Sequence, residues 1–297
     1  MSGRLYFYRR GSDRREEEII LGGGLMRWAY RSRIGRALTG FLFNRRWPSR
    51  LAGWYADSRW SRRQIAPVIR NLGIDTAEFA DPVGSYPTFN AFFTRRLKPG
   101  ARPFSPEDEQ VASPADGRVL VYPQLRETTL LPVKGKSFTL DTLLGMPAAG
   151  YAGGSLAIVR LCPADYHRFH FPCDARVIEQ RRIHGHYHSV NSLVLAMGIG
   201  VFDQNERQIT RMENSRLGEF ALIEVGAFGV GSIVQTFTGD EVRKGEEKGY
   251  FQYGGSTIVL LFRQGRVAFC TDLIAHSAEG IETFLKAGQL LARMTAT

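Results

Sequence analysis

Two patterns of apolar and polar residues divide the chain. Over residues 25–60, arginines alternate with large apolar side chains. Within this stretch Ile34, Leu38, Phe41 and Leu42 have the spacing of one helical face. The pattern predicts an amphipathic helical segment with a basic, polar side.

A second helix is predicted over residues 61–72, because Gly73 is a typical stop signal. The segment 95–100, Arg-Arg-Leu-Lys-Pro-Gly, is rich in turn formers and indicates a boundary. We therefore expect residues 1–103 to form a helical, membrane-associating region and residues 104–297 to form a separate catalytic domain.

Beyond this boundary, short apolar runs separated by glycine and proline predict strands. The predicted strands are Gly117–Tyr122, Leu156–Leu161, Ala221–Val225, Ser232–Phe237, Ile258–Phe262 and Val267–Cys270. Residues 242–249 and 285–292 share an apolar-basic-x-Gly pattern and resemble hairpins of biotinyl/lipoyl-type β sandwiches. The second stretch could equally be a helix, and we favour the β interpretation. The predicted fold class is α+β: an N-terminal amphipathic helical region, then a β-rich core for which a barrel-sandwich is a candidate architecture.

Charge is distributed unevenly. Residues 1–102 hold 20 Lys and Arg against 8 Asp and Glu, whereas the rest holds 19 against 21. All four tryptophans also lie in the first third of the chain. A basic surface favours an anionic partner, either nucleic acid or phospholipid. Tryptophan beside a basic amphipathic helix favours the lipid surface, and no nucleic-acid recognition motif is found.

Other features limit the class of protein. No apolar run reaches the roughly 18 residues that span a bilayer. The first arginines are not followed by the apolar stretch of a secretory signal, so we expect no secretory signal. The three cysteines are an odd number without metal-type spacing, which favours a reducing compartment.

The tetrapeptide Gly254-Gly255-Ser256-Thr257 precedes a predicted buried strand. Gly255 leaves its own carbonyl unhindered, and Ser256 places a hydroxyl one residue away. Such a bond can be attacked from within the chain. Taken alone, however, the tetrapeptide is more simply a glycine-rich turn.

Three other segments carry candidate chemistry. Asp116 lies in an Asp-Gly turn, and His167 and His170 lie three residues apart before a proline. A glycine-rich stretch at 225–233 could supply N–H donors to an oxyanion. Three further histidines within residues 184–188 lack the spacing of a zinc motif, so no metal is predicted.

In these segments the chain resembles the phosphatidylserine decarboxylase family. The similar segments follow the same order along most of the chain. They are residues 49–61, 88–103, 114–119, 134–145, 165–172, 189–193, 205–207, 225–233 and 242–257. The family often carries LGST where this chain has GGST, which is typical of one branch.

The resemblance implies that the chain cleaves itself between Gly255 and Ser256, giving a β chain, 1–255, and an α chain, 256–297. It maps the family's self-cleavage triad onto Asp116, His170 and Ser256. Ser256 would become a pyruvoyl cofactor that forms a Schiff base with the amine of phosphatidylserine. His167 matches the family histidine assigned to decarboxylation, as a carboxylate contact or a proton donor.

The resemblance also implies partners and location. The expected partners are an anionic phospholipid surface, phosphatidylserine and the chain's own two fragments. Nucleic acid is not among them, and a homo-oligomer is left open. The expected location is peripheral, at the cytoplasmic face of a bacterial-type cell membrane.

Three alternative functions differ from this one in what they require of the sequence. A pyruvoyl-dependent decarboxylase of a soluble amino acid would share the site but would not need a basic, Trp-rich region. A biotinyl/lipoyl-like carrier needs a modifiable lysine in a context that none of the candidate lysines has. A serine hydrolase using Ser256 and His170 would need a Gly-x-Ser-x-Gly elbow, which is missing around Ser256.

Overall fold

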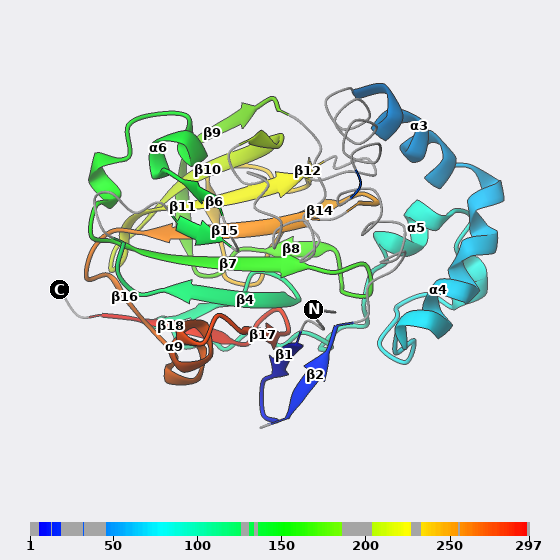
Figure 1. Cartoon of the computed structure of the whole chain (residues 1–297), viewed down its shortest axis with the longest axis horizontal. Helices are drawn as coiled ribbons and strands as arrows, with labels where there is room; N and C mark the ends of the chain where they lie inside the picture. Colours follow the sequence, from blue (N-terminus) through cyan, green and yellow to red (C-terminus); the bar gives the residue numbers. More distant parts are fainter. Residues whose placement is uncertain are drawn as a thin grey trace.

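The computed structural model describes residues 6–12, 14–18, 32, 46–125, 131–133, 136–185, 204–226, 233–254 and 256–295. It contains both helices and large sheets, so the predicted α+β class is confirmed. Helices α3, α4 and α5 lie together on one side of the β-rich part of the molecule (Figure 1). No helix among these residues is both long and apolar enough to cross a membrane.

The helices described between residues 46 and 93 lie within the region predicted to be helical, whereas Tyr6–Arg9 and Arg15–Glu17 of the same region form strands of the large sheet. The helical elements are α3 (Arg46–Ala56), η1 (Arg59–Gln64), α4 (Ile65–Leu72), η2 (Val83–Ser85) and α5 (Phe89–Phe93). Helix α4 ends at Gly73, whose φ of +61° is the left-handed cap that glycine favours. The predicted helical face from Ile34 to Leu42 lies outside the described residues.

A ten-stranded sheet forms the centre of the molecule, in the order β13-β9-β10-β11-β15-β7-β4-β17-β1-β2. Its first five strands are β13 (Glu241–Val242), β9 (Ala175–Ile183), β10 (Arg207–Asn214), β11 (Gly218–Gly226) and β15 (Ser256–Phe262). The others are β7 (Ser155–Leu161), β4 (Gly117–Tyr122), β17 (Glu282–Leu285), β1 (Tyr6–Arg9) and β2 (Arg15–Glu17). Neighbouring strands are antiparallel except β1 and β17, which are parallel.

Both faces of the central strands are buried. On β15, Ile258 and Leu260 join the larger apolar cluster, whereas Val259 and Leu261 join a second cluster on the opposite face. Helix α6 (Leu140–Leu144) contributes to the second cluster. A strand covered on two sides is apolar without alternation, which explains the continuous run that predicted it.

The remaining elements are short. One three-stranded sheet holds β12 (Ile233–Gln235), β14 (Glu247–Phe251) and β8 (Arg168–His170). Another holds β16 (Val267–Phe269), β18 (Leu290–Met294) and β3 (Gln110–Ala112). The pair β5 (Leu131–Val133) and β6 (Lys136–Phe138), the turn η3 (Ala149–Tyr151) and helix α9 (Thr271–Ala278) complete the described elements.

The barrel-like form of the predicted core is not found among these residues. The edge strands of the large sheet, β13 and β2, pair with β9 and β1 and not with each other. The sheet is therefore open, and smaller sheets rather than ring closure help to cover one face.

The two stretches with similar sequence form matching turns between strands. Gly245 and Gly288 have φ values of +82° and +86°, which only glycine adopts readily. Gly245 N–H donates to the Phe171 carbonyl, and Phe171 N–H donates to the carbonyl of Glu246. In the same way Gly288 N–H donates to the Ser113 carbonyl, and Ser113 N–H donates to the carbonyl of Gln289. The β interpretation of residues 285–292 is thus confirmed.

This internal repeat brings two Pro-x-Asp segments, 114–116 and 172–174, together. His170 N–H donates to the Pro114 carbonyl at 2.8 Å, and Ala112 N–H donates to the Pro172 carbonyl at 2.9 Å. Asp116 Oδ1 accepts from Ala287 N–H at 2.8 Å, just as Asp174 Oδ1 accepts from Lys244 N–H at 2.7 Å. These backbone hydrogen bonds between the two segments place Asp116 close to His170.

Candidate active site

Ser256 is the first residue of β15, at the centre of the large sheet. It pairs with Gly226 on β11 and Leu161 on β7, and it is fully buried. Its hydroxyl has no hydrogen-bond partner among the described residues. A buried hydroxyl that makes no hydrogen bond is free to attack a neighbouring carbonyl, and Ser256 directly follows the Gly254-Gly255 pair.

The segment that precedes Ser256 is anchored to helix α5. Tyr253 N–H donates to Asn90 Oδ1 at 3.0 Å, and the Tyr253 ring packs edge-on against Phe89 and Phe93. Gly254 has a φ of +149°, which other residues rarely adopt. Gly255 itself lies outside the described residues. The predicted scissile bond thus follows a fixed, glycine-dependent turn.

His167 is fully buried and its ring packs on Phe93, with ring centres 3.8 Å apart. Its Nδ1 lies 2.9 Å from the Asp165 carbonyl. Because a carbonyl only accepts, Nδ1 must carry the proton, and Nε2 presents a lone pair. Burial, and then the charge of Arg95, lower the pKa of His167 to about 3, so the ring is neutral at pH 7.

His170 ends β8 and has the same tautomer. Its Nδ1 donates to the Gly245 carbonyl at 3.0 Å, and its ring lies between Tyr166 and Phe104. Burial lowers the pKa of His170, while the Gly245 carbonyl, the charge of Glu247 and then the charge of Asp116 act in the opposite direction. Nε2 of each histidine is buried without a hydrogen-bond partner in the described part of the chain. Both imidazoles can therefore accept a proton at Nε2.

Asp116 is almost fully buried, and its carboxylate is bound by other groups. Arg102 donates to both oxygens, with N–O distances of 2.7 and 2.6 Å, and Ala287 N–H donates to Oδ1. Within the described chain, the structure does not form the Asp116–His170 or His170–Ser256 hydrogen bonds of the predicted triad. Asp116 acts on His170 through its charge, and the Pro114 carbonyl of the same segment accepts the backbone N–H of His170. The triad stays a prediction.

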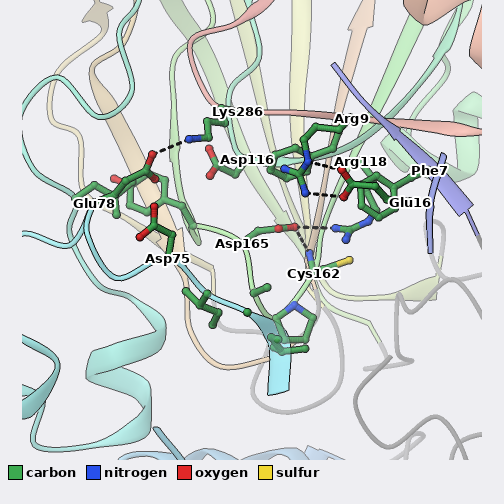
Figure 2. A pocket seen from close by; sticks show the side chains of 18 of the residues that line it. Phe7, Arg9, Glu16, Asp75, Glu78, Asp116, Arg118, Cys162, Asp165 and Lys286 are labelled. Carbon is green, nitrogen blue, oxygen red and sulfur yellow. Dashed lines mark hydrogen bonds and ion pairs between the residues drawn. The ribbon is translucent and has the colours of Figure 1, made fainter. Parts of the chain in front are cut away.

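A cavity of about 360 Å³ adjoins this site (Figure 2). Asp116, Asp165 and Arg95 contribute to its wall, but neither site histidine nor Ser256 does. Ion pairs join residues that line it, among them Arg118 with Asp165 and Lys286 with Glu78. The cavity therefore borders Asp116 but does not reach Ser256.

Several contacts of the site were missed from the sequence. They include Asn90, Arg95, Arg102 and the carbonyl of Gly245. The fully buried ion pair of Lys248 with Glu224, at 2.5 Å, was also missed. The repeated Pro-x-Asp pattern at 114–116 and 172–174 was a signal that could have placed Asp116 beside His170. The histidines at 186 and 188 lie outside the described residues.

The fold and the site together define an α+β protein with a buried serine at the start of its central strand and two neutral histidines tied to nearby segments. The family model described as phosphatidylserine decarboxylase matches residues 89–293. The chain belongs to the phosphatidylserine decarboxylase family.

Full-length relatives bear this out. A protein of Chlamydia trachomatis named phosphatidylserine decarboxylase proenzyme is 43% identical over 292 residues, covering 97% of each chain. Proteins of the same name from Chlamydia pneumoniae and Ruminiclostridium cellulolyticum are 42% and 38% identical. They cover 90% and 97% of each chain, respectively. The similarity thus includes the helical region as well as the β-rich part.

Proposed function

We propose that this chain is a self-processing decarboxylase that converts phosphatidylserine to phosphatidylethanolamine. The observation that carries the proposal is the buried, unpartnered hydroxyl of Ser256, next to Gly255 and at the start of the central strand. Relatives named phosphatidylserine decarboxylase proenzyme along nearly the whole chain support the substrate and the self-cleavage.

Self-cleavage assigns a proton acceptor to the serine. Ser256 Oγ attacks the Gly255 carbonyl, and Nε2 of His170 accepts the hydroxyl proton. His170 gives this proton to the Ser256 nitrogen as the peptide C–N bond breaks and an ester forms. Loss of the Ser256 α-proton then expels Gly255 as a carboxylate and leaves dehydroalanine. Water then releases ammonia and leaves a pyruvoyl group at position 256. Asp116 favours the protonated imidazole through its negative charge, while Gly245 fixes the tautomer.

The position of Ser256 fits a pyruvoyl group. Loss of its hydroxyl breaks no hydrogen bond among the described residues, and full burial shields a reactive ketone from bulk solvent. The rest of β15, from Thr257 onward, keeps its pairing with β11 and β7. The two fragments stay together after cleavage because β15 lies between two strands of the β chain.

The pyruvoyl group, once present, supplies the electron sink for loss of CO2 from the substrate. The substrate amine attacks a carbonyl in its neutral form, and Nε2 of His167 presents a lone pair that can take up the proton released as the new C–N bond forms. The same atom can return that proton to the carbon that loses CO2. In this role His167 is a proton carrier, which deepens its predicted part as a donor.

The substrate class can be tested directly. We expect purified enzyme to release CO2 from phosphatidylserine in mixed micelles and to leave free serine unchanged. The physical reason is that a soluble amino acid gains nothing from the basic, Trp-rich surface. Radiolabelled carboxyl groups on both substrates measure the two rates under one condition. Comparable rates on free serine would favour the alternative, a decarboxylase of a soluble amino acid.

The proposed docking surface lies on α3 and η1. It consists of the exposed side chains Leu51, Trp54, Tyr55, Arg59, Trp60, Arg62 and Arg63. Trp54 and Trp60 are 77% and 72% exposed, which is unusual for such large apolar groups. Tryptophan partitions to the lipid headgroup level, and each nearby arginine contributes ~1 kcal/mol of attraction to an anionic surface. The surface supports peripheral binding at an anionic membrane face.

We expect replacement of both Trp54 and Trp60 by alanine to weaken binding to anionic vesicles about tenfold or more. The reason is the loss of the apolar area that the two rings would bury in the lipid. Ile178→Ala is the control, since Ile178 is an exposed apolar residue on β9. Sedimentation with phosphatidylserine-containing vesicles, at low and high salt, measures the effect. Binding that is insensitive to salt and to the tryptophan changes would rule out this surface.

A further inference from the structure

Arg95 is a buried cation with unusual surroundings. It follows helix α5, is 4% exposed, and lies over the rings of Phe79 and Phe92 at 4.9 and 5.1 Å. Its Nε and Nη1 have no hydrogen-bond partner among the described residues. Burial of a guanidinium without a bonded carboxylate is costly, so the position calls for a compensating role.

The third nitrogen of Arg95 points to that role. Nη2 donates to the carbonyls of Ala164 and Asp165, at 2.9 and 3.0 Å. The Asp165 carbonyl also accepts the Nδ1 proton of His167, at 2.9 Å. One backbone oxygen therefore receives hydrogen bonds from both residues. Whatever fixes this oxygen also fixes the ring of His167.

We propose that Arg95 is a positioning residue for His167. It holds the carbonyl that orients the imidazole, and it places a permanent positive charge beside the ring. The inference rests on the proposed function, since it assigns a purpose to the decarboxylation histidine. It adds a residue, and an electrostatic setting, that the family resemblance did not assign.

The charge acts on one property of the ring, its affinity for a proton. After burial, Arg95 is the cause that lowers the pKa of His167. The carboxylate of Asp165 is engaged by Arg118 at 3.2 Å and by Cys162 N–H at 2.7 Å (Figure 2). Neighbouring Arg168 is paired with Glu247. Phe93 and Tyr253, on the α5 side, carry no charge at neutral pH.

The consequence concerns the return of the proton. An imidazolium beside a fixed cation is a stronger acid than an ordinary one. A proton taken up at Nε2 is thus given back readily to the carbon that loses CO2. The residue speeds the second half of the transfer, and it keeps His167 neutral between turnovers.

The test without turnover uses the uncleaved Ser256→Ala chain labelled with ¹⁵N-histidine. The chain has six histidines, so each ring can be assigned by single replacement. We expect His167 to show the Nδ1–H tautomer and to remain neutral far below pH 6.5. Arg95→Met should raise its pKa by about one unit or more. Arg96→Met, the same change at an adjacent exposed arginine, should leave it unchanged.

Activity of the cleaved enzyme gives a second readout. With Arg95→Met we expect normal self-cleavage, turnover at pH 7 lowered about tenfold or more, and an acid limb moved to higher pH. A pKa of His167 that does not change on loss of Arg95 would overturn the inference, even if activity fell. If Arg95→Met does not fold, Arg95→Gln, which removes the charge and keeps an N–H donor, decides by the same criterion.

Replacement of His167 distinguishes failure of the proposed function from failure of the role of Arg95. If His167→Ala retains full turnover, the assigned role of His167 fails, and the positioning role of Arg95 with it. If His167→Ala loses turnover but Arg95→Met leaves the pKa of His167 unmoved, only the role of Arg95 fails.

Discussion

The Ser256→Ala protein is expected to remain a single chain of 297 residues, with no decarboxylase activity. The hydroxyl is the attacking group and the source of the cofactor, so its loss removes both steps. Burial of Ser256 on a central strand means that alanine fits without a clash or a lost hydrogen bond. Intact-mass spectrometry should show one species, whereas the unaltered protein should give fragments 1–255 and 256–297, the second blocked at its N-terminus.

Thr257 provides a matched control for this experiment. It is equally buried, also lacks a hydrogen-bond partner among the described residues, and points to the opposite face of β15. Thr257→Val should therefore still cleave. His170→Ala should stay uncleaved like Ser256→Ala, because no other group is assigned to accept the serine proton. Full-length Ser256→Ala protein that decarboxylates phosphatidylserine would refute the central proposal, as would complete cleavage of His170→Ala.

The His167→Ala protein is expected to cleave normally and to lose turnover by about 10²- to 10⁴-fold, the usual contribution of a positioned acid or base. Self-cleavage relies on His170, whose Nδ1 is fixed by Gly245, so the two steps should separate. Mass spectrometry measures the first step, and release of CO2 from phosphatidylserine measures the second. His276→Ala is a control, since His276 lies on α9 beside Tyr8.

The pH dependence follows from the direction of the pKa shift. Because the pKa of His167 is lowered to about 3, its neutral form persists as pH falls through 6.5. An acid limb near pH 6.5 in turnover, lost in His167→Ala, would contradict the buried and neutral ring. If His167→Ala failed to cleave, His167 would be needed for self-cleavage as well. The proposed assignment of self-cleavage to His170 and decarboxylation to His167 would then be wrong.

The strands were predictable because their apolar runs reflect burial on both faces. Gly117–Tyr122 was predicted to the residue, and the runs at 156–161 and 258–262 lie within β7 and β15. The long antiparallel pair β9 and β10 was missed, since charged residues alternate along it and it lacks a continuous apolar run. The sequence also did not predict that the large sheet is open, because this depends on whether its two edge strands pair with each other.

The sequence by itself determined which side chains can react. The glycine pair before Ser256, the two histidines three apart and Asp116 are chemical groups, and their order along the chain identifies the family. Only the tertiary structure decided how they are held. The carbonyls of Asp165 and Gly245 fix the tautomers of His167 and His170, and Arg102 donates hydrogen bonds to the Asp116 carboxylate. Backbone oxygens are the same for every residue type, so contacts such as Arg95 to Asp165 leave no local pattern to read.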